Sequence, residues 1–174
     1  MIHTFILGPS GSGKSVVASH LAQSDNLLWL ELDLCVEGTA HHGFRTEWED
    51  FLDNARPEPL ASKLDALAAP AEKRAVVLSF PGYPIFEPCH MRAARNHFRI
   101  AYLTGTKDQC LQAFLDREAQ NGRHLPREYW EKCSESFFEF LRFSAVPTTC
   151  IPAFASNGNR RSLGDICDDV RCVA

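Results

Sequence analysis

Residues 8–15 decide the fold and read Gly8-Pro9-Ser10-Gly11-Ser12-Gly13-Lys14-Ser15. They match the pattern G-x-x-x-x-G-K-[ST] at every fixed position. A short apolar run over 2–7 precedes this stretch, and a helical pattern over 14–23 follows it. In a strand–loop–helix unit of this kind, the backbone N–H groups and the helix dipole attract an anion. The sequence therefore predicts a loop that binds the phosphates of a nucleotide.

The residue types in this loop suit a nucleoside triphosphate with Mg²⁺. Glycine at positions 8 and 13 permits backbone angles that a side chain would forbid. Lys14 is placed to reach the β- and γ-phosphates, and the Ser15 hydroxyl is placed to bind Mg²⁺. The predicted nucleotide-binding residues are Gly8, Pro9, Ser10, Gly11, Ser12, Gly13, Lys14, Ser15 and Val16.

Composition limits the remaining possibilities. The chain has 174 residues, of which 45% are hydrophobic, enough for one domain with its own core. No apolar run approaches the roughly 20 residues of a membrane helix, and the first residues do not resemble a signal peptide. We therefore expect a cytoplasmic protein without a membrane partner. A net charge of -4 disfavours binding of nucleic acid through a broad basic face. The seven cysteines include no C-x-x-C pair, which favours reduced thiols over a zinc site.

Short apolar segments alternate with helical patterns along the chain. Strands are predicted over 2–7, 27–32, 75–80, 99–103 and 148–153. Helices are predicted over 14–23, 47–54, 60–69, 88–96, 107–118, 126–143 and 162–172. Nearly continuous apolar strands are typical of a parallel sheet covered on both faces. The pattern predicts a single three-layer α/β domain over 1–174, with five parallel strands.

Two connections are longer than this architecture requires. Ligands of open α/β sheets bind beyond the carboxyl ends of the strands, where long connections form caps and lids. We therefore expect a substrate cap over about 34–74 and a lid over about 117–130. The oligomeric state is left open by the sequence.

Asp33 follows the second predicted strand and is expected at the edge of the sheet where ligands bind. There it would position an acceptor hydroxyl, take its proton, or hold a water molecule on Mg²⁺; the alternative is an ordinary helix-capping aspartate. After the third strand, many phosphate-loop enzymes carry an aspartate for Mg²⁺, but this chain has Ser79. Pro81 and Gly82 then either let a substrate approach the backbone or form a plain turn.

Three arginines are candidates for contacts with anions. Arg117 and Arg123 flank the end of the helix predicted over 107–118, close to the expected lid. A guanidinium delivered by a lid would neutralise charge on the transferring phosphoryl group. Arg45, in the expected cap, is a candidate anchor for an anionic substrate. For Arg117 and Arg123, the alternative is a solvated surface arginine or a partner of the helix dipole.

With these residues in place, the chain resembles the small-molecule kinases of the P-loop superfamily, in the shikimate, gluconate and adenylate kinase-like group. The resemblance implies five parallel strands with the phosphate-loop strand at the centre. It implies that Asp33 binds the substrate hydroxyl, that Arg117 packs near the adenine, and that Arg123 touches the phosphates. Residues 79–82 depart from the Asp-Gly and double-glycine forms of the group, which argues against shikimate or a monophosphate as acceptor.

The sequence thus predicts ATP-dependent phosphoryl transfer to a hydroxyl of a small metabolite, with Lys14, Asp33 and Arg123 as catalytic residues. A nucleoside or nucleotide kinase is one alternative. A nucleotide-binding switch with slow ATP hydrolysis is another, and a polynucleotide end-kinase is a third. No N-K-x-D motif for reading guanine occurs, which favours ATP over GTP. The acceptor itself is left open by the sequence.

Overall fold

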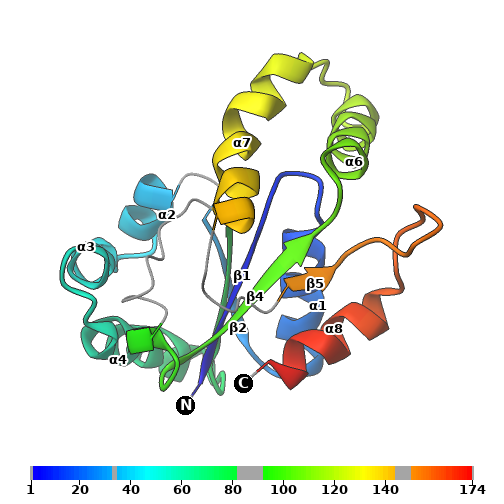
Figure 1. Cartoon of the computed structure of the whole chain (residues 1–174). Helices are drawn as coiled ribbons and strands as arrows, with labels where there is room; N and C mark the ends of the chain where they lie inside the picture. Colours follow the sequence, from blue (N-terminus) through cyan, green and yellow to red (C-terminus); the bar gives the residue numbers. More distant parts are fainter. Residues whose placement is uncertain (1, 33–34, 82–91, 144–149, 174) are drawn as a thin grey trace.

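The fold is built on a parallel sheet of five strands, seen in a computed structural model that describes residues 2–32, 35–81, 92–143 and 150–173 (Figure 1). The strands are β1 (His3–Gly8), β2 (Leu28–Glu31), β3 (Val76–Pro81), β4 (Phe98–Thr104) and β5 (Cys150–Pro152). Their order across the sheet is β2-β3-β1-β4-β5, and every neighbouring pair is parallel. The five-stranded α/β fold with the phosphate-loop strand at its centre is therefore confirmed.

Helices follow the strands much as the sequence predicted. They are α1 (Lys14–Ser24), α2 (Cys35–His41), α3 (Arg45–Asn54), α4 (Pro57–Ala68), α6 (Lys107–Gln120), α7 (Arg127–Phe143) and α8 (Leu163–Cys172), with a 3-10 turn, η1 (Ala69–Ala71), after α4. The short helix α2 was not predicted, and most of the helix predicted over 88–96 lies outside the described residues.

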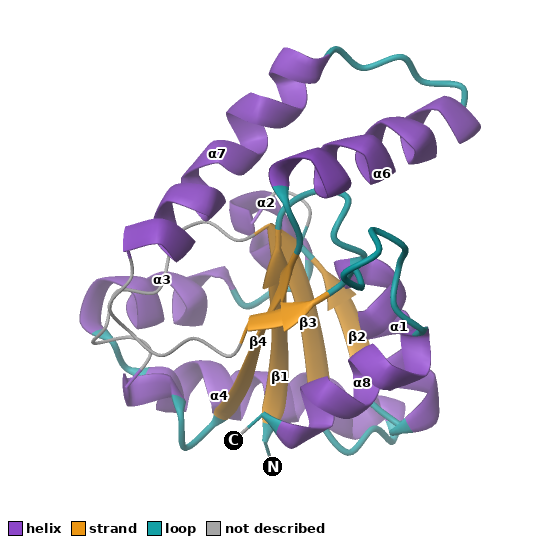
Figure 2. Ribbon diagram, turned by 45° about the vertical axis from the view of Figure 1, so that its right-hand side comes forward, coloured by secondary structure: helices purple, strands orange, loops and turns teal. Residues whose placement is uncertain are grey.

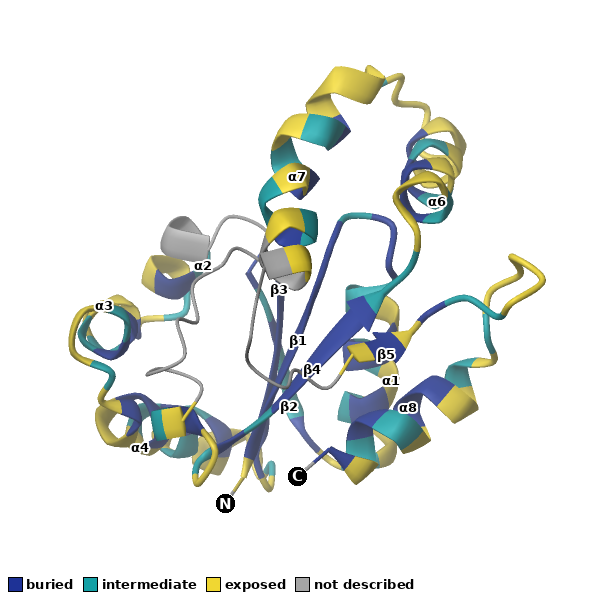
Figure 3. Ribbon diagram, viewed as in Figure 1, coloured by how far each residue is buried: buried dark blue, intermediate teal, exposed yellow. Residues whose placement is uncertain are grey.

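Two apolar cores lie on the two faces of the sheet (Figures 2 and 3). Successive strand residues point to opposite faces. Phe5 and Leu7 of β1 therefore join the core under α3 and α4, whereas Ile6 joins the core under α1 and α8. Since both faces are covered, the strands are apolar throughout, and β1 is buried along its whole length.

Beyond the carboxyl ends of the strands, α6 and α7 form a helical pair that stands over the phosphate loop (Figure 1). A third, smaller core joins these two helices through Cys110, Leu111, Phe114 and Trp130. The expected cap region contains α2, α3 and α4, and the last two cover one face of the sheet. In the described part of the chain, no helix combines the length and apolarity needed to cross a lipid bilayer.

Candidate functional site

The phosphate loop joins the end of β1 to the start of α1. Its first half is closed by a turn in which Ser12 N donates to Pro9 O at 3.1 Å. Gly13 caps α1 in the left-handed region, at φ 94°, where glycine is favoured because it has no Cβ. Lys14 Nζ lies 3.2 Å from Pro9 O, so this side chain folds back over the loop.

The N-terminus of α1 differs from those of α6 and α8. The last two begin with side-chain caps, from Thr106 and Ser162 respectively. By contrast, α1 has neither a side-chain cap nor an acidic residue in its first turn. Its first N–H groups and the positive end of its dipole are therefore left for a ligand, as a phosphate site requires.

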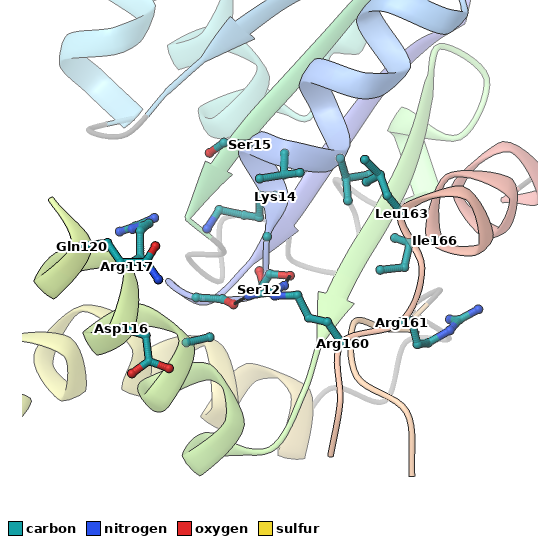
Figure 4. Close-up of a pocket in the computed structure, with 15 residues that line it drawn as sticks. Ser12, Lys14, Ser15, Asp116, Arg117, Gln120, Arg160, Arg161, Leu163 and Ile166 are labelled. Atoms are coloured by element: carbon teal, nitrogen blue, oxygen red, sulfur yellow. Dashed lines mark hydrogen bonds between the residues drawn. The ribbon is translucent and has the colours of Figure 1, made fainter. Parts of the chain in front are cut away.

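A cavity of about 410 Å³ opens over this helix end (Figure 4). The lining residues come from the loop and α1 on one side, from α6 on another, and from the segment around Arg160 and α8 on a third. Of the predicted nucleotide-binding residues, Gly11, Ser12, Gly13, Lys14, Ser15, Val16 and Arg117 line it. This volume falls within the ordinary range for small-molecule sites.

Ser15 lies beside a carboxylate that the sequence reasoning had not selected. Its hydroxyl donates a hydrogen bond to Glu31 Oε1, at the end of β2. A hydroxyl and a carboxylate are hard oxygen donors, and Mg²⁺ binds to one or two protein oxygens together with substrate phosphates. The pair therefore fits Mg²⁺. A larger acidic or histidine cluster of metal-binding size is absent from the described residues.

Ser79, which stands where an aspartate is common, is already engaged. It is buried opposite Glu31 in the register of β2 and β3, and its hydroxyl accepts a hydrogen bond from Trp29 Nε1 at 2.9 Å. The side chains of Trp29 and Glu31 lie on the same face of the sheet as the first turn of α1. The carboxylate beside Ser15 therefore comes from β2 and not from β3, where Ser79 stands.

The two predicted lid arginines share one carboxylate. Glu118 is 2% exposed, and its oxygens lie 2.8 Å from Arg117 Nη2 and 2.6 Å from Arg123 Nε. Burial raises the pKa of Glu118, but the hydrogen bonds and charges of the two arginines outweigh this effect and hold the pKa below its usual value. Arg117 lines the cavity, whereas Arg123 lies in a separate groove with His124 and Leu125. The phosphate contact of Arg123 therefore stays a prediction.

Arg160 is, with Glu31, a residue of the site whose role the sequence reasoning missed. Its guanidinium lies against the phosphate loop, with Nη1 3.0 Å from Ser12 O and Nη2 2.5 Å from Gly11 O. Figure 4 shows Arg160 on one side of the loop and Arg117, from α6, on the other. The only sequence signal was its position after the last strand, next to the edge where ligands bind.

The predicted acceptor residues are placed only in part. Asp33 and Gly82 lie outside the described residues. Pro81 ends β3 opposite Gly8 in the sheet register, beside the start of the phosphate loop. Arg45 begins α3 and pairs with Glu49 at 2.7 Å, with both side chains about half exposed.

Cys110, under the loop, is not a nucleophile at neutral pH. It is buried in the first turn of α6, and this burial raises the pKa of its thiol to about 11. The thiolate, which is the reactive form, is therefore scarce. The described residues that line the cavity thus supply positive charge and an uncapped helix N-terminus, and none of them is an activated nucleophile.

A scan against protein-family models finds no match, and neither does a search of curated protein sequences. Solved structures do match along almost the whole chain. A gluconokinase from Sinorhizobium meliloti has 18% identity and a TM-score of 0.53, over 97% of this chain and 89% of that one. A shikimate kinase from Acinetobacter baumannii, solved with shikimate, has 15% identity and a TM-score of 0.54, over 98% and 91%.

A third match is the YorR protein of Bacillus subtilis, solved in complex with phosphorylated GDP. It has 14% identity and a TM-score of 0.54, over 97% of this chain and 93% of that one. The fold is thus that of the P-loop kinases in the shikimate and gluconate kinase group. At such identities the likeness establishes the architecture.

Proposed function

We propose that this protein is an ATP-dependent kinase that phosphorylates a hydroxyl group of a small metabolite. The observation that carries the proposal is the cavity over the uncapped N-terminus of α1, lined by Lys14, Ser15 and Arg117. The gluconokinase and shikimate kinase that share this fold support a small hydroxylated acceptor. Magnesium, when bound by Ser15 and Glu31, would neutralise charge on the phosphates.

The reaction requires positioning and charge stabilisation rather than covalent catalysis. The loop N–H groups and the first turn of α1 bind the β- and γ-phosphates, and Lys14 adds a full positive charge. The acceptor oxygen attacks the γ-phosphorus, the bond to the β–γ bridging oxygen breaks, and ADP leaves. We assign Asp33 to orient the acceptor hydroxyl and receive its proton, because it follows β2 in the sequence and ligands of open α/β sheets bind beyond the carboxyl ends of the strands.

Arg117 completes the nucleotide site in this proposal. Its guanidinium lies 5.4 Å from the centre of the Phe114 ring, and Glu118 accepts hydrogen bonds from its Nε and Nη2 edge. A planar cation on the wall of the cavity can stack on a base. Arg123 is the candidate for delivering charge to the γ-phosphate, which requires that it leave Glu118.

The direct test is incubation with ATP, Mg²⁺ and a library of hydroxylated metabolites, with mass spectrometry used to find the gain of one phosphoryl group. Lys14→Ala should abolish transfer while the circular dichroism spectrum stays unchanged, and Lys132→Ala, on the exposed side of α7, serves as the control. Full turnover by Lys14→Ala would refute this mechanism. Asp33→Asn should lower turnover more than ATP affinity, and parental activity in that variant would remove Asp33 from the site.

A nucleoside or nucleotide acceptor is the second candidate, because YorR of the same fold was solved with phosphorylated GDP. Nucleosides and nucleoside monophosphates therefore belong in the library, and a base-selective acceptor would decide for this candidate. ATP hydrolysis with no stimulation by any acceptor would instead favour a nucleotide-dependent switch.

A further inference from the structure

The phosphate loop can bind an anion only if its peptide groups keep one orientation. Where N–H groups point inward, the carbonyl oxygens of the same peptides point outward and need partners of their own. The first helical bond of α1, from Val17 N at 3.1 Å, uses Gly13 O. The carbonyls of Ser10, Gly11 and Ser12 precede this bond and lie beyond β1, so neither helix nor sheet supplies their donors.

Side chains from distant parts of the chain supply those donors. Arg160 donates from Nη2 to Gly11 O at 2.5 Å and from Nη1 to Ser12 O at 3.0 Å. Trp130 of α7, 1% exposed, donates from Nε1 to Ser10 O at 2.8 Å. The donors lie 120 to 149 positions from their acceptors, so tertiary structure rather than local sequence fixes the loop.

Arg160 is itself held in place. Its guanidinium lies 4.9 Å from the centre of the Phe154 ring, and residues 154 and 160 form an isolated bridge. The turn between them is closed by a hydrogen bond from Ala155 N to Asn159 O at 2.8 Å. A Cβ on Gly13 would lie only 2.7 Å from Arg160 Nη1, which shows how closely the guanidinium approaches the loop.

Arg160 also differs from the other arginines of the site in its partners. Arg117 and Arg123 both pair with Glu118. Within the described ranges, no carboxylate pairs with Arg160, and its guanidinium donates to the carbonyls of Gly11 and Ser12. Burial lowers the pKa of Arg160, yet an arginine stays protonated at neutral pH. The planar fork of a guanidinium suits two adjacent carbonyl oxygens better than the single ammonium of a lysine does.

We infer that Arg160 is a positioning residue for the phosphate loop. Through Gly11 O it fixes the peptide whose Ser12 N–H closes the turn to Pro9 O, and through Ser12 O it fixes the peptide whose Gly13 N–H faces the phosphates. Trp130 does the same for the Gly11 N–H through Ser10 O. This inference deepens the proposed function, because the loop is taken to bind polyphosphate. Arg160 acts on ligand binding by orienting the loop peptides and not by contacting the ligand with its own charge.

Two substitutions of Arg160 separate the effect of its planar pair of donors from the effect of its positive charge. Arg160→Lys keeps the positive charge but loses the planar pair of donors, whereas Arg160→Gln loses both. Arg56→Gln is the matched control, because Arg56 is an exposed arginine paired with Asp50, away from the cavity. One readout is hydrogen–deuterium exchange of residues 9–15 without ligand. The other is calorimetric affinity, with Mg²⁺ present, for ATP and for tripolyphosphate, which lacks base and ribose.

Both Arg160 variants should exchange faster over residues 9–15, because the turn bond from Ser12 N to Pro9 O opens more often. Affinity for ATP and for tripolyphosphate should fall by the same factor, about 10- to 100-fold, as expected for loss of charge-assisted hydrogen bonds. Arg56→Gln should match the parent. The inference is overturned if exchange of the loop is unchanged in both variants or if Arg160→Lys binds tripolyphosphate as the parent does. Loss of ATP affinity alone would assign Arg160 to the nucleoside and would equally overturn it.

Trp130→Phe provides an independent test, which also serves if an Arg160 variant does not fold. The phenyl ring retains much of the packing but removes the donor to Ser10 O. It should speed exchange of the loop and weaken tripolyphosphate binding less than the Arg160 variants do. A parent protein that binds neither ATP nor tripolyphosphate, while the variants still show faster exchange, would refute the proposed kinase and leave the positioning role intact.

Discussion

Gly11 offers a direct test of how closely α6 packs on the phosphate loop. A Cβ at this position would overlap the backbone carbonyl oxygen of Cys110 and lie 3.0 Å from Phe114 N, both in the first turns of α6. These neighbours are backbone atoms and cannot rotate away. Gly11 also has a φ of 89°, in the left-handed region that L side chains rarely adopt. Gly11→Ala therefore has two separable costs.

The conformational cost is measured by Gly43→Ala. Gly43 has a φ of 75°, and a Cβ there would have no neighbour within 4 Å. This control should lower the free energy of unfolding by about 1–2 kcal/mol, the usual cost of a left-handed alanine. Gly11→Ala adds the overlap with α6, which requires the loop and the helix to separate by about 1 Å and costs a further 1–3 kcal/mol or so.

Urea unfolding at neutral pH, followed by circular dichroism, gives the free energy of unfolding of both variants from the same extrapolation. Gly11→Ala should be the less stable of the two by about 1–3 kcal/mol, and calorimetry should show weaker ATP binding in that variant alone. Equal stability of the two variants would mean that α6 does not press on the loop, and the packing described for the site would then be wrong.

Three further outcomes are expected. Glu31→Gln should raise the Mg²⁺ concentration needed for half-maximal ATP binding about 10-fold or more, measured by titration, and an unchanged requirement would separate Glu31 from the metal. Burial lowers the pKa of His3 below 6.5, so below pH 6.5 the unfolded chain binds more protons than the folded one. The free energy of unfolding should therefore fall on acidification, by up to about 1.4 kcal/mol per pH unit. His3→Asn should lose this slope when urea unfolding is measured at several pH values. Glu118→Gln should lower the free energy of unfolding at pH 7 by about 1–3 kcal/mol, because it removes the ion pairs with Arg117 and Arg123. The difference from the parent should shrink as the pH falls through the lowered pKa of Glu118. A difference that stays constant with pH would argue against the ion pairs.

The sequence predicted the scaffold because its signals are local. Each strand is an apolar run, and Gly8, Gly13, Lys14 and Ser15 stand at fixed spacings in one loop. The central place of the first strand came from the resemblance to the P-loop kinases and not from these local signals, and the strand order confirms it.

The parts of the site that were missed depend on contacts between distant residues. Period-two alternation was enough to place Glu31 on the same face as Trp29, but the identity of that face is set by where α1 packs. Asp33 was preferred because it follows the strand predicted over 27–32, at the edge where ligands bind, whereas Glu31 lies inside that predicted strand. The position of the Glu31 carboxylate beside Ser15 thus depends on how α1 packs on the sheet.

Arg160 shows the same limit more strongly. Nothing near it in sequence marks it as different from Arg161, yet Arg161 pairs with Asp169 of α8, whereas Arg160 bonds two carbonyls of the phosphate loop. What separates the two is that adjacent residues of an extended segment point to opposite sides, so one faces α8 and the other faces the loop. In the proposed kinase, N–H groups of residues 8–15 bind the phosphates, while Arg160 and Trp130 bond the loop carbonyls and so keep those N–H groups oriented. Phosphate binding would therefore depend on residues that no local motif contains.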